Sequence, residues 1–498
     1  MLSKRLNIWL LEFDKTKISA ASILSDVRRS RQVAAAQMNQ KVHLRAIPND
    51  PDFFSQWQYD NTGANNGISD ADIDAPPAWD ITTGGTTVTG EEIVIGIVDG
   101  GVNLIHPDLA GNIWTNRNEI PDNGIDDDNN GFIDDIFGWN FNENNNDVGN
   151  GGNGHHHGSP VMGILGAEGN NGIGVTGVNW NIKVMNLVGN SSSDEVIAAY
   201  NYMLDMRISY NETNGTEGAF VVATNASLGV PDSFPDAFPV WCAMYNRLGE
   251  AGIISAGATV NRNTNVEADG DIPTTCTSDY LISVTNTDNR DQKPFGAGFG
   301  ATHIDLSAPG AGAFTVDNSG GYSAFGGTSA ATPHVAGAVA LLYSVPIPAF
   351  MDDVRQNPRE AARLVRNFIL QGVDEIPDLQ GITNTGGRLN LFNSINLLQE
   401  YYNIESGALP KDAVFINSIS PNPATENIQV DIKLYESTVI TAKLLNALGQ
   451  EVSRQSLGRK DRGIHPTDFS LKDLPKGVYF VSVIANSLGS VATEKVLK

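Results

Sequence analysis

Ser329 is a candidate nucleophile and lies in the stretch GGTSAATPHVAGAVALLY, residues 326–343. Small and apolar residues of this kind suit a helix that is packed on all sides inside a sizeable domain. We expect Pro333 in the first turn of that helix, where proline is tolerated, so that Ser329 falls at or just before the helix N-terminus. There its backbone N–H would point outward and could stabilise a developing oxyanion. The alternative is an ordinary serine that caps a core helix.

A carboxylate suited to the same chemistry follows a predicted strand. Residues 92–98, EIVIGIV, form a β-branched run typical of a buried parallel strand, and Asp99 comes directly after it, before two glycines. Open α/β sheets place their sites at the carboxyl ends of such strands. Taken alone, Asp99 could equally be an aspartate that starts a turn.

A candidate base lies in GNGGNGHHHGSPVMGILGA, residues 149–167. The three consecutive histidines invite a metal interpretation, but neighbouring side chains point in different directions and no fourth ligand is evident. Only His157 is followed by Gly-Ser and a small-residue apolar helix. His157 is therefore the candidate base.

Together these segments resemble the signatures of the subtilisin-like serine proteases, the subtilase family. The matching stretches are IVDGGVNLIHPDL, HGSPVMGIL and GTSAATPHVAG, and their order along the chain is that of the subtilisins. The resemblance implies a secreted serine endopeptidase with a triad of Asp99, His157 and Ser329. In it Ser329 forms the acyl-enzyme, His157 acts as general base and then general acid, and Asp99 fixes the histidine tautomer.

The sequence departs from the family pattern at the second oxyanion donor. After Ser-Ala-Gly most subtilases place an asparagine, whereas Ala258 stands at the matching position in ISAGATVNRNTN. Thr259, Asn261 and Asn263 are the alternatives left open for that role. Because alanine has no donor, a non-catalytic relative that keeps the fold for binding or assembly stays an alternative to a protease. An esterase that shares the triad is a third possibility.

The resemblance also implies where a substrate binds. ASLGV, residues 226–230, resembles the family's strand at which an extended substrate pairs in β-fashion. The residues expected to bind substrate, around the pocket for the residue before the cut, are Ser227, Leu228, Gly229 and Gly257. Without the resemblance, ASLGV would be read as sheet core followed by a turn.

An acidic loop lies between the aspartate and histidine segments. Residues 118–141, NEIPDNGIDDDNNGFIDDIFGWNF, carry alternating oxygen-bearing side chains followed by a glycine, as in the first part of a calcium loop. The predicted Ca²⁺ ligands are Asp126, Asp128, Asn130 and Asp134. Phe137 stands where an EF-hand has its final glutamate, so the segment is not a complete EF-hand. The alternative is a solvated acidic loop.

Strands and helices alternate around these segments. Strand patterns at 182–188, 218–229 and 281–285 and the helical spacing of SDEVIAAYNYMLDMR predict an α/β fold. We expect a doubly wound, mostly parallel sheet, as in subtilisin. Residues 414–498 instead show short alternating strands between Gly and Pro turns, which predicts a small β-sandwich.

The C-terminal segment carries a resemblance of its own. SPNPATENIQV, LLNALGQEV and LKDLPKGVYFVSV resemble the C-terminal sorting domain of the type IX secretion system. This implies an export address, the secretion machinery as a partner, and a secreted or cell-surface location. A carbohydrate-binding sandwich is the alternative.

The predicted organisation has four parts. The basic N-terminal segment reads strand, helix, strand and resembles the second half of the propeptide that chaperones and inhibits subtilases, an α+β remnant. The parts are a partial propeptide at 1–45, a peptidase domain at 46–397, a linker at 398–413 and the sorting sandwich at 414–498.

Charge and composition limit the classes of binding partner that we expect. The net charge of −25 argues against nucleic acid and anionic membranes, and no apolar run reaches the length of a membrane span. LNIWLLEF, near the N-terminus, is too short and acidic for a secretory core, so we expect no signal peptide in this chain. For Cys242 and Cys276, a disulfide and two free thiols both remain open.

Overall fold

The computed structural model describes residues 46–149 and 155–402, most of 414–498, and scattered positions before 46. Those earlier positions are 9–11, 13, 23, 27–30 and 33–36; the C-terminal part omits 422–423, 435–437, 448, 461–462, 473 and 486–489. Residues 1–47 form a unit of their own, in which the described residues 23 and 27–29 are helical. Most of the predicted propeptide and of the predicted linker therefore lies outside the described residues.

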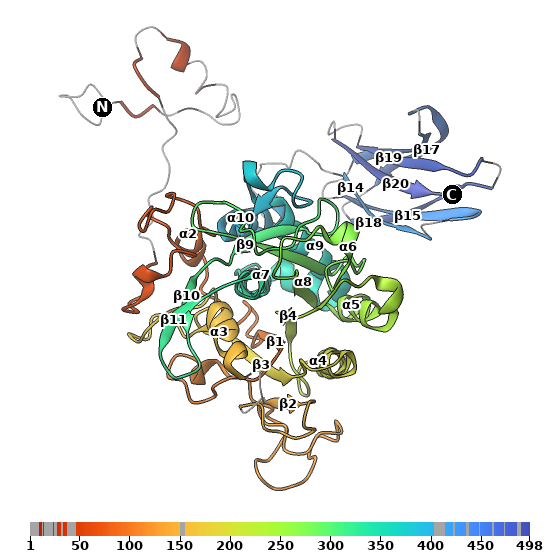
Figure 1. Ribbon diagram of the computed structural model, residues 1–498. Coiled ribbons are helices and arrows are strands. Elements are labelled where there is room, and N and C mark those ends of the chain that lie inside the picture. The colour runs from red at the N-terminus through yellow and green to blue at the C-terminus, as the bar shows by residue number, and fades with distance from the viewer. Residues whose placement is uncertain are drawn as a thin grey trace. The chain divides into compact units, whose positions relative to one another are not determined.

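A nine-stranded sheet forms the centre of the peptidase part (Figure 1). Its strand order is β12-β13-β9-β8-β6-β4-β1-β3-β2, and all neighbours run parallel except β12 and β13. The strands are β1 Val94–Asp99, β2 Gly138–Asn140, β3 Lys183–Val188, β4 Val221–Ala226, β6 Ile254–Ala258, β8 Leu281–Thr287, β9 Leu306–Pro309, β12 Asp374–Glu375 and β13 Gly387–Arg388. The predicted doubly wound, mostly parallel sheet is confirmed.

Helices cover both faces of this sheet (Figure 1). On one face lie α3 (His155–Gly166) and α7 (Thr328–Tyr343), which pack on each other, and on the other lie α4 (Ser193–Thr213) and α5 (Pro239–Ala251). The remaining helices are α2 Ala75–Trp79, α6 Val266–Asp269, α8 Pro348–Gln356, α9 Pro358–Gln371 and α10 Leu391–Tyr402, with short 3₁₀ turns at Phe53–Ser55, Ala110–Asn112, Pro235–Ala237 and Pro377–Leu379. Two short ribbons, β5 (Val230–Pro231) with β7 (Asp271–Ile272) and β10 (Ala313–Val316) with β11 (Tyr322–Phe325), lie outside the sheet.

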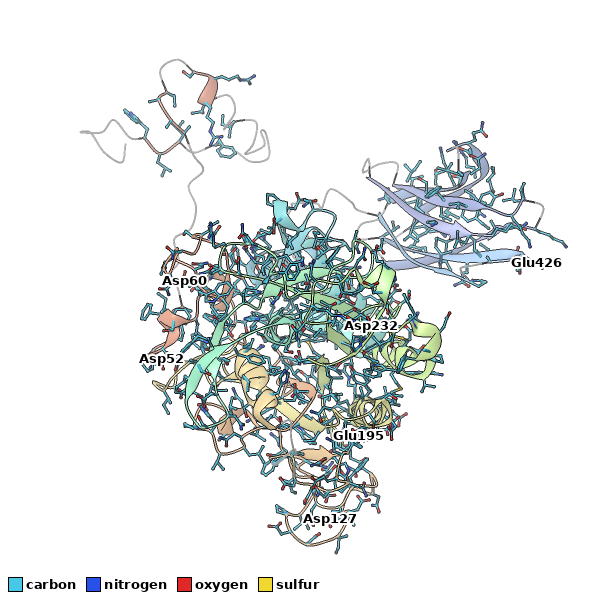
Figure 2. The ribbon with its side chains drawn as sticks, in the orientation of Figure 1. Asp52, Asp60, Asp127, Glu195, Asp232 and Glu426 are labelled. Atoms are coloured by element: carbon cyan, nitrogen blue, oxygen red, sulfur yellow. A yellow bond between two sulfur atoms is a disulfide. The ribbon has the colours of Figure 1, made fainter. Side chains whose placement is uncertain are left out.

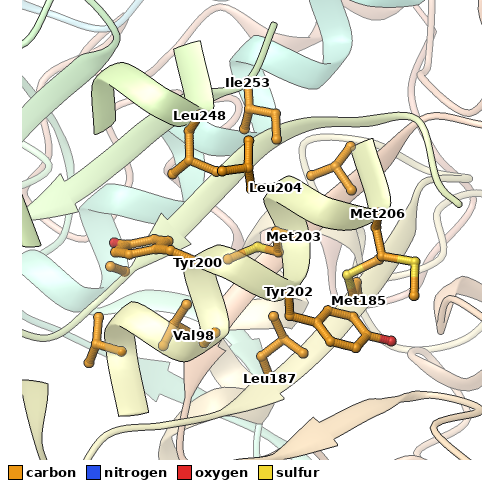
Figure 3. Close-up of a cluster of buried hydrophobic side chains, with 14 of the residues drawn as sticks. Val98, Met185, Leu187, Tyr200, Tyr202, Met203, Leu204, Met206, Leu248 and Ile253 are labelled. Carbon is orange, nitrogen blue, oxygen red and sulfur yellow. The ribbon is translucent and has the colours of Figure 1, made fainter. Parts of the chain in front are cut away.

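The face that carries α4 buries a large apolar cluster (Figure 3). Val98 of β1 and Leu187 of β3 meet Met203 of α4, and Leu248 of α5 closes the cluster. Gly96 makes this close packing possible, because a Cβ at that position would lie 1.9 Å from the sulfur of Met203. Burial of this kind fixes β1, and hence its carboxyl end, against the helices.

Helix α7 is buried along its whole length, as the sequence predicts. It begins at Thr328, so Pro333 falls in the second turn, and the prediction that it lies in the first turn is wrong. Proline has no N–H to donate to the carbonyl four residues earlier, which is that of Ser329. The hydroxyl of Ser227 donates to this carbonyl instead, at 3.1 Å.

Cys242 and Cys276 form a disulfide, with their Cα atoms 5.2 Å apart. The bond joins α5 to the segment that follows β7. Of the two alternatives that the sequence leaves open, a disulfide or two free thiols, the structure contains the disulfide.

The C-terminal part is a small β-sandwich of two antiparallel sheets. One sheet has the order β14-β15-β18 and the other β17-β16-β19-β20. The strands are β14 Val414–Ser420, β15 Asn427–Leu434, β16 Thr438–Asn446, β17 Glu451–Lys460, β18 Gly463–Ser470, β19 Val478–Ala485 and β20 Ser490–Leu497. Alternate residues such as Val430, Ile440 and Val481 fill the core between the sheets, which confirms the predicted sandwich.

Acidic side chains reach the outside of the peptidase part. Asp52 and Asp127 lie at its edge in Figure 2, and both are partly exposed.

Among the described residues, no single helix is long and apolar enough to cross a membrane. Helices α7 and α8 reach that length and apolar character only together, as a pair bent by 106°.

Candidate active site

Asp99 ends β1 at the carboxyl edge of the sheet, where its side chain is almost fully buried. The backbone N–H of Gly100 donates to its Oδ1 at 2.7 Å. The backbone therefore supplies the carboxylate with a hydrogen bond that needs no side chain at position 100.

His157 is the third residue of α3, and its Nδ1 lies 2.9 Å from each oxygen of Asp99. Ser159, in the same turn, accepts the backbone N–H of Asn103 at 2.9 Å and so ties the start of α3 to the loop that follows Asp99. Phe325 of β11 packs edge-on against the imidazole, with ring centroids 5.4 Å apart. The imidazole is therefore held by Asp99 and Phe325 on a helix start that is itself tied to the loop after Asp99.

Two opposing effects set the pKa of His157. Partial burial lowers it, whereas the hydrogen bond and negative charge of Asp99 raise it, and the net direction is upward. In the neutral form a proton on Nδ1 donates to Asp99, which leaves the lone pair on Nε2. This is the tautomer that a general base needs.

Strand register brings the serine to the same edge. Val98 of β1 pairs with Ala226 of β4, so the next residues of the two strands, Asp99 and Ser227, lie at neighbouring strand ends. Ser329 Oγ donates to the carbonyl of Ser227 at 3.3 Å. The structure thus joins Asp99 to His157 by a direct hydrogen bond and holds Ser329 at the adjacent strand.

The start of α7 is open at Ser329. Gly327 caps the helix with φ +89°, a conformation that favours glycine. Ser329 is the second helical residue, so its backbone N–H belongs to the first turn, whose donors have no partner within the helix. The dipole of α7 adds positive potential there.

Asn261 lies against this helix start. Its Oδ1 accepts the N–H of Thr328 at 2.8 Å and the hydroxyl of Thr328 at 3.1 Å. A Cβ on Gly327 would lie 2.6 Å from the same oxygen, so the glycine also makes room for the amide. With Oδ1 bound in this way, the NH₂ group of Asn261 is left to donate.

Among the described residues, the side chains of the other two alternatives for the second donor form no hydrogen bond with the start of α7. The hydroxyl of Thr259 donates to the carboxylate of Asp271 at 2.9 Å. Asn263 accepts Lys293 Nζ at 3.0 Å and is exposed. The sequence names Asn261 as one of three possibilities, and only the fold of the loop after β6 separates them.

A pocket of about 180 Å³ opens beside Ser329. Its lining includes three of the predicted residues, Ser227, Leu228 and Gly229. Gly257 does not line the pocket: it is buried in β6, where a Cβ would lie 2.8 Å from a ring carbon of Pro273. Its neighbour Ala258 lines the pocket instead, and so does Asp271, which no sequence motif marks.

The acidic loop brings together a different set of side chains from the one predicted. Carboxylate oxygens of Glu119, Asp128 and Asp135 all lie within 4.8 Å of one another, and only Asp128 belongs to the predicted set. Asn130 points its NH₂ group at this cluster and donates to Asp128 and Asp135. Burial raises the pKa of Asp135 to about 6, although the hydroxyl of Tyr202 donates to it.

Two predicted metal ligands bond to their own loop. The carboxylate of Asp126 accepts the backbone N–H groups of Asn130 and Gly131, at 3.0 and 2.9 Å. The carboxylate of Asp134 accepts the N–H groups of Asn123 and Gly124, also at 3.0 and 2.9 Å. Glu119 also accepts backbone N–H groups of this loop, those of Asp127, Asp128 and Asp134, although it belongs to the facing set.

Two family models match the sequence. Residues 90–380 match the subtilase family, and residues 418–498 match a secretion system C-terminal sorting domain. The first match covers more than half of the chain and contains Asp99, His157 and Ser329. The chain belongs to the subtilase family.

Curated subtilisin-like proteins show the same kinship. This subtilase is 27% identical over 335 residues to subtilisin-like protease 1 of Plasmodium berghei, an alignment that covers 62% of this chain and 50% of that protein. It is 30% identical over 299 residues to thermitase of Thermoactinomyces vulgaris, covering 60% of this chain and 85% of thermitase. The chain spans about half the length of the first curated relatives that it matches.

A solved structure supports the fold of the subtilase. A protease from Pseudoalteromonas arctica superimposes with a TM-score of 0.50 at 21% identity, covering 70% of this chain and 98% of that one. At this identity the likeness shows the architecture alone.

Proposed function

We propose that this subtilase is a secreted serine endopeptidase that hydrolyses peptide bonds through Asp99, His157 and Ser329. The observation that carries the proposal is the position of His157 Nδ1, 2.9 Å from both oxygens of a buried Asp99, at the sheet edge where Ser227 holds Ser329. A buried carboxylate that orients a histidine beside a serine at a helix start is the arrangement that activates a hydroxyl for acyl transfer.

The reaction follows from these groups. Ser329 Oγ turns from the Ser227 carbonyl toward His157, gives its proton to Nε2, and bonds to the carbonyl carbon of the substrate. Asp99 stays ionised and stabilises the imidazolium. His157 then gives the proton to the leaving amine as the C–N bond breaks, and the same base activates the water that releases the acyl group.

We assign the oxyanion to two donors, the backbone N–H of Ser329 and the NH₂ group of Asn261. The bonds from Thr328 to Asn261 Oδ1 support this assignment, because they fix which end of the amide faces away from the helix. With Asn261 as the second donor, the lack of a donor at Ala258 no longer favours a non-catalytic relative. Donors held in place before the reaction need no rearrangement as charge develops on the oxygen.

An extended peptide would lie along residues 227–229 and place one side chain in the adjoining pocket. Support comes from the lining of that pocket by Ser227, Leu228 and Gly229 next to Ser329. Strand addition of this kind gives affinity through main-chain hydrogen bonds, and the pocket gives selectivity.

The remaining parts serve export and inhibition in this proposal. The sorting-domain match at 418–498 supports type IX secretion as the route and a secreted or cell-surface location. Residues 1–45 would be the inhibitor-like remnant, 46–397 the peptidase domain, 398–413 the linker and 414–498 the sorting sandwich. Helix α10 runs to Tyr402, a few residues past the first of the two linker boundaries.

We also propose that the acidic loop binds a structural calcium ion. Glu119, Asp128 and Asp135 supply hard carboxylate oxygens, the donors that Ca²⁺ prefers, and no described Lys or Arg pairs with any of them. Three carboxylates this close would repel one another without a cation. Asp126, Asn130 and Asp134, the other predicted ligands, would hold the loop around this set.

Replacement of the nucleophile tests the proposed activity. Ser329→Ala should lower the hydrolysis of an unfolded protein substrate by about 10⁶-fold, the scale known for the same change in a subtilisin. Ser323→Ala, at an exposed serine of β11, is the control and should retain activity. Cleavage of esters but not of peptides by the wild type would contradict an endopeptidase, and equal activity of Ser329→Ala would contradict the triad.

Replacement of the second donor tests the oxyanion assignment. Asn261→Ala should lower kcat by about 10²–10³-fold with little change in KM, a magnitude known from removal of such a donor in a subtilisin. Asn263→Ala removes the same side chain two residues away and should leave kcat unchanged. A loss in Asn263→Ala rather than in Asn261→Ala would contradict the assignment.

Calcium removal tests the metal proposal. Chelation should lower the melting temperature, and Ca²⁺ at about 100 times its Kd should return about 2.7 kcal/mol of stability. Asp135→Asn should reduce this calcium-dependent rise, whereas Asp122→Asn, an exposed position of the same loop, should not. An equal rise in Asp135→Asn and wild type, measured by scanning calorimetry, would contradict this ligand set.

A further inference from the structure

The pocket beside Ser329 contains a buried carboxylate, that of Asp271. Asp271 begins β7, which pairs antiparallel with β5, and its register partner is Pro231. It thus lies across a two-stranded ribbon from the residues that follow Gly229. The triad, the oxyanion donors and the proposed calcium site make no use of this carboxylate.

The hydrogen bonds of Asp271 are one-sided. Oδ2 accepts the hydroxyl of Thr274 at 2.7 Å, the hydroxyl of Thr259 at 2.9 Å and the N–H of Val260 at 3.0 Å. Oδ1 accepts no hydrogen bond from the described residues and keeps a small exposed surface, although Asp271 as a whole is only 1% exposed. One oxygen therefore anchors the side chain, and the lone pairs of the other have no partner among the described residues.

No described cation pairs directly with this carboxylate. Arg262 is the charged group that acts on it, and the guanidinium of Arg262 is hydrogen-bonded to Asp232. Burial raises the pKa of Asp271, and the hydrogen bonds from Thr274 and Thr259 oppose that rise. A buried carboxylate with a free oxygen gains most from a ligand that brings a positive charge and a donor.

We propose that Asp271 makes this pocket selective for a lysine or arginine side chain at the residue before the cleaved bond. The inference rests on the proposed peptidase function and deepens it. The apolar stem of such a side chain would pass Leu228 and Ala258, and its charged head would donate to Oδ1 of Asp271. An apolar side chain in the same place would cover Oδ1 without giving it a partner, which disfavours binding.

Peptide substrates that differ only at this residue test the proposal on the full chain. Lysine and norleucine have the same stem and differ in the ammonium group, and arginine and leucine extend the series. We expect kcat/KM for the lysine and arginine peptides to exceed that for norleucine by about 10²-fold, the scale of a buried, hydrogen-bonded charge. Equal or higher kcat/KM for norleucine would overturn the proposal.

Asp271→Asn keeps the shape and an acceptor for Thr259, Val260 and Thr274 but removes the charge. It should lower kcat/KM for the lysine peptide by about 10²-fold and leave that for norleucine within a few-fold. Asp269→Asn removes the same charge from an exposed position of α6 and should leave the preference unchanged. If Asp271→Asn does not fold, the ratio of kcat/KM for the lysine and norleucine peptides on the wild type still tests the proposed selectivity.

A fluorophosphonate probe separates this inference from the function on which it rests, because the probe reports an activated serine whatever side chain the pocket selects. Protein that reacts with the probe and prefers norleucine would overturn the role of Asp271 alone. Protein that neither reacts with the probe nor cleaves any of the peptides would overturn the proposed function, and this inference with it.

Discussion

The site depends on the parallel alignment of β1 with β4, whose carboxyl ends stop side by side at one edge of the central sheet. The pairing of Val98 with Ala226 places Asp99 next to Ser227. From Asp99 a hydrogen bond reaches the first turn of α3, and from Ser227 two hydrogen bonds reach the first turn of α7. The buried apolar faces of the sheet fix these strand ends, so the polar groups are positioned by a core that has no part in the chemistry.

The main lines of this arrangement are predictable from the sequence because they depend on local patterns. Local patterns predict each element together with the polar residue at its end. A β-branched run predicts the strand before Asp99, and runs of small residues predict the helices that begin near His157 and Ser329. Their order resembles that of one family, and the family match and the sheet topology agree with it. The C-terminal sandwich is likewise readable from short alternating strands and turn residues.

The rest depends on how distant loops fold back on these elements. Asn261 bonds to Thr328, the residue before Ser329, only because the loop after β6 turns toward the cap of α7, which no spacing reveals. Asp271 enters the pocket through the pairing of two very short strands. In the acidic loop, the carboxylates that face one another include Glu119 and Asp135, which lie outside the predicted set, whereas Asp126 bonds to the backbone of its own loop. Pro333 lies one turn later than expected, and the freed carbonyl of Ser329 gains a bond from Ser227.

The most direct test is the rate at which a fluorophosphonate probe labels the folded protein as a function of pH, with the labelled residue located by mass spectrometry. The account predicts a label on Ser329 and a rate that falls as the pH is lowered through a midpoint above the ordinary histidine value of about 6.5, because Asp99 raises the pKa of His157 and only the neutral imidazole can take the proton. Asp99→Asn should move that midpoint to lower pH and slow the labelling. A label on another residue, or a rate that is constant between about pH 5 and 8, would contradict the account.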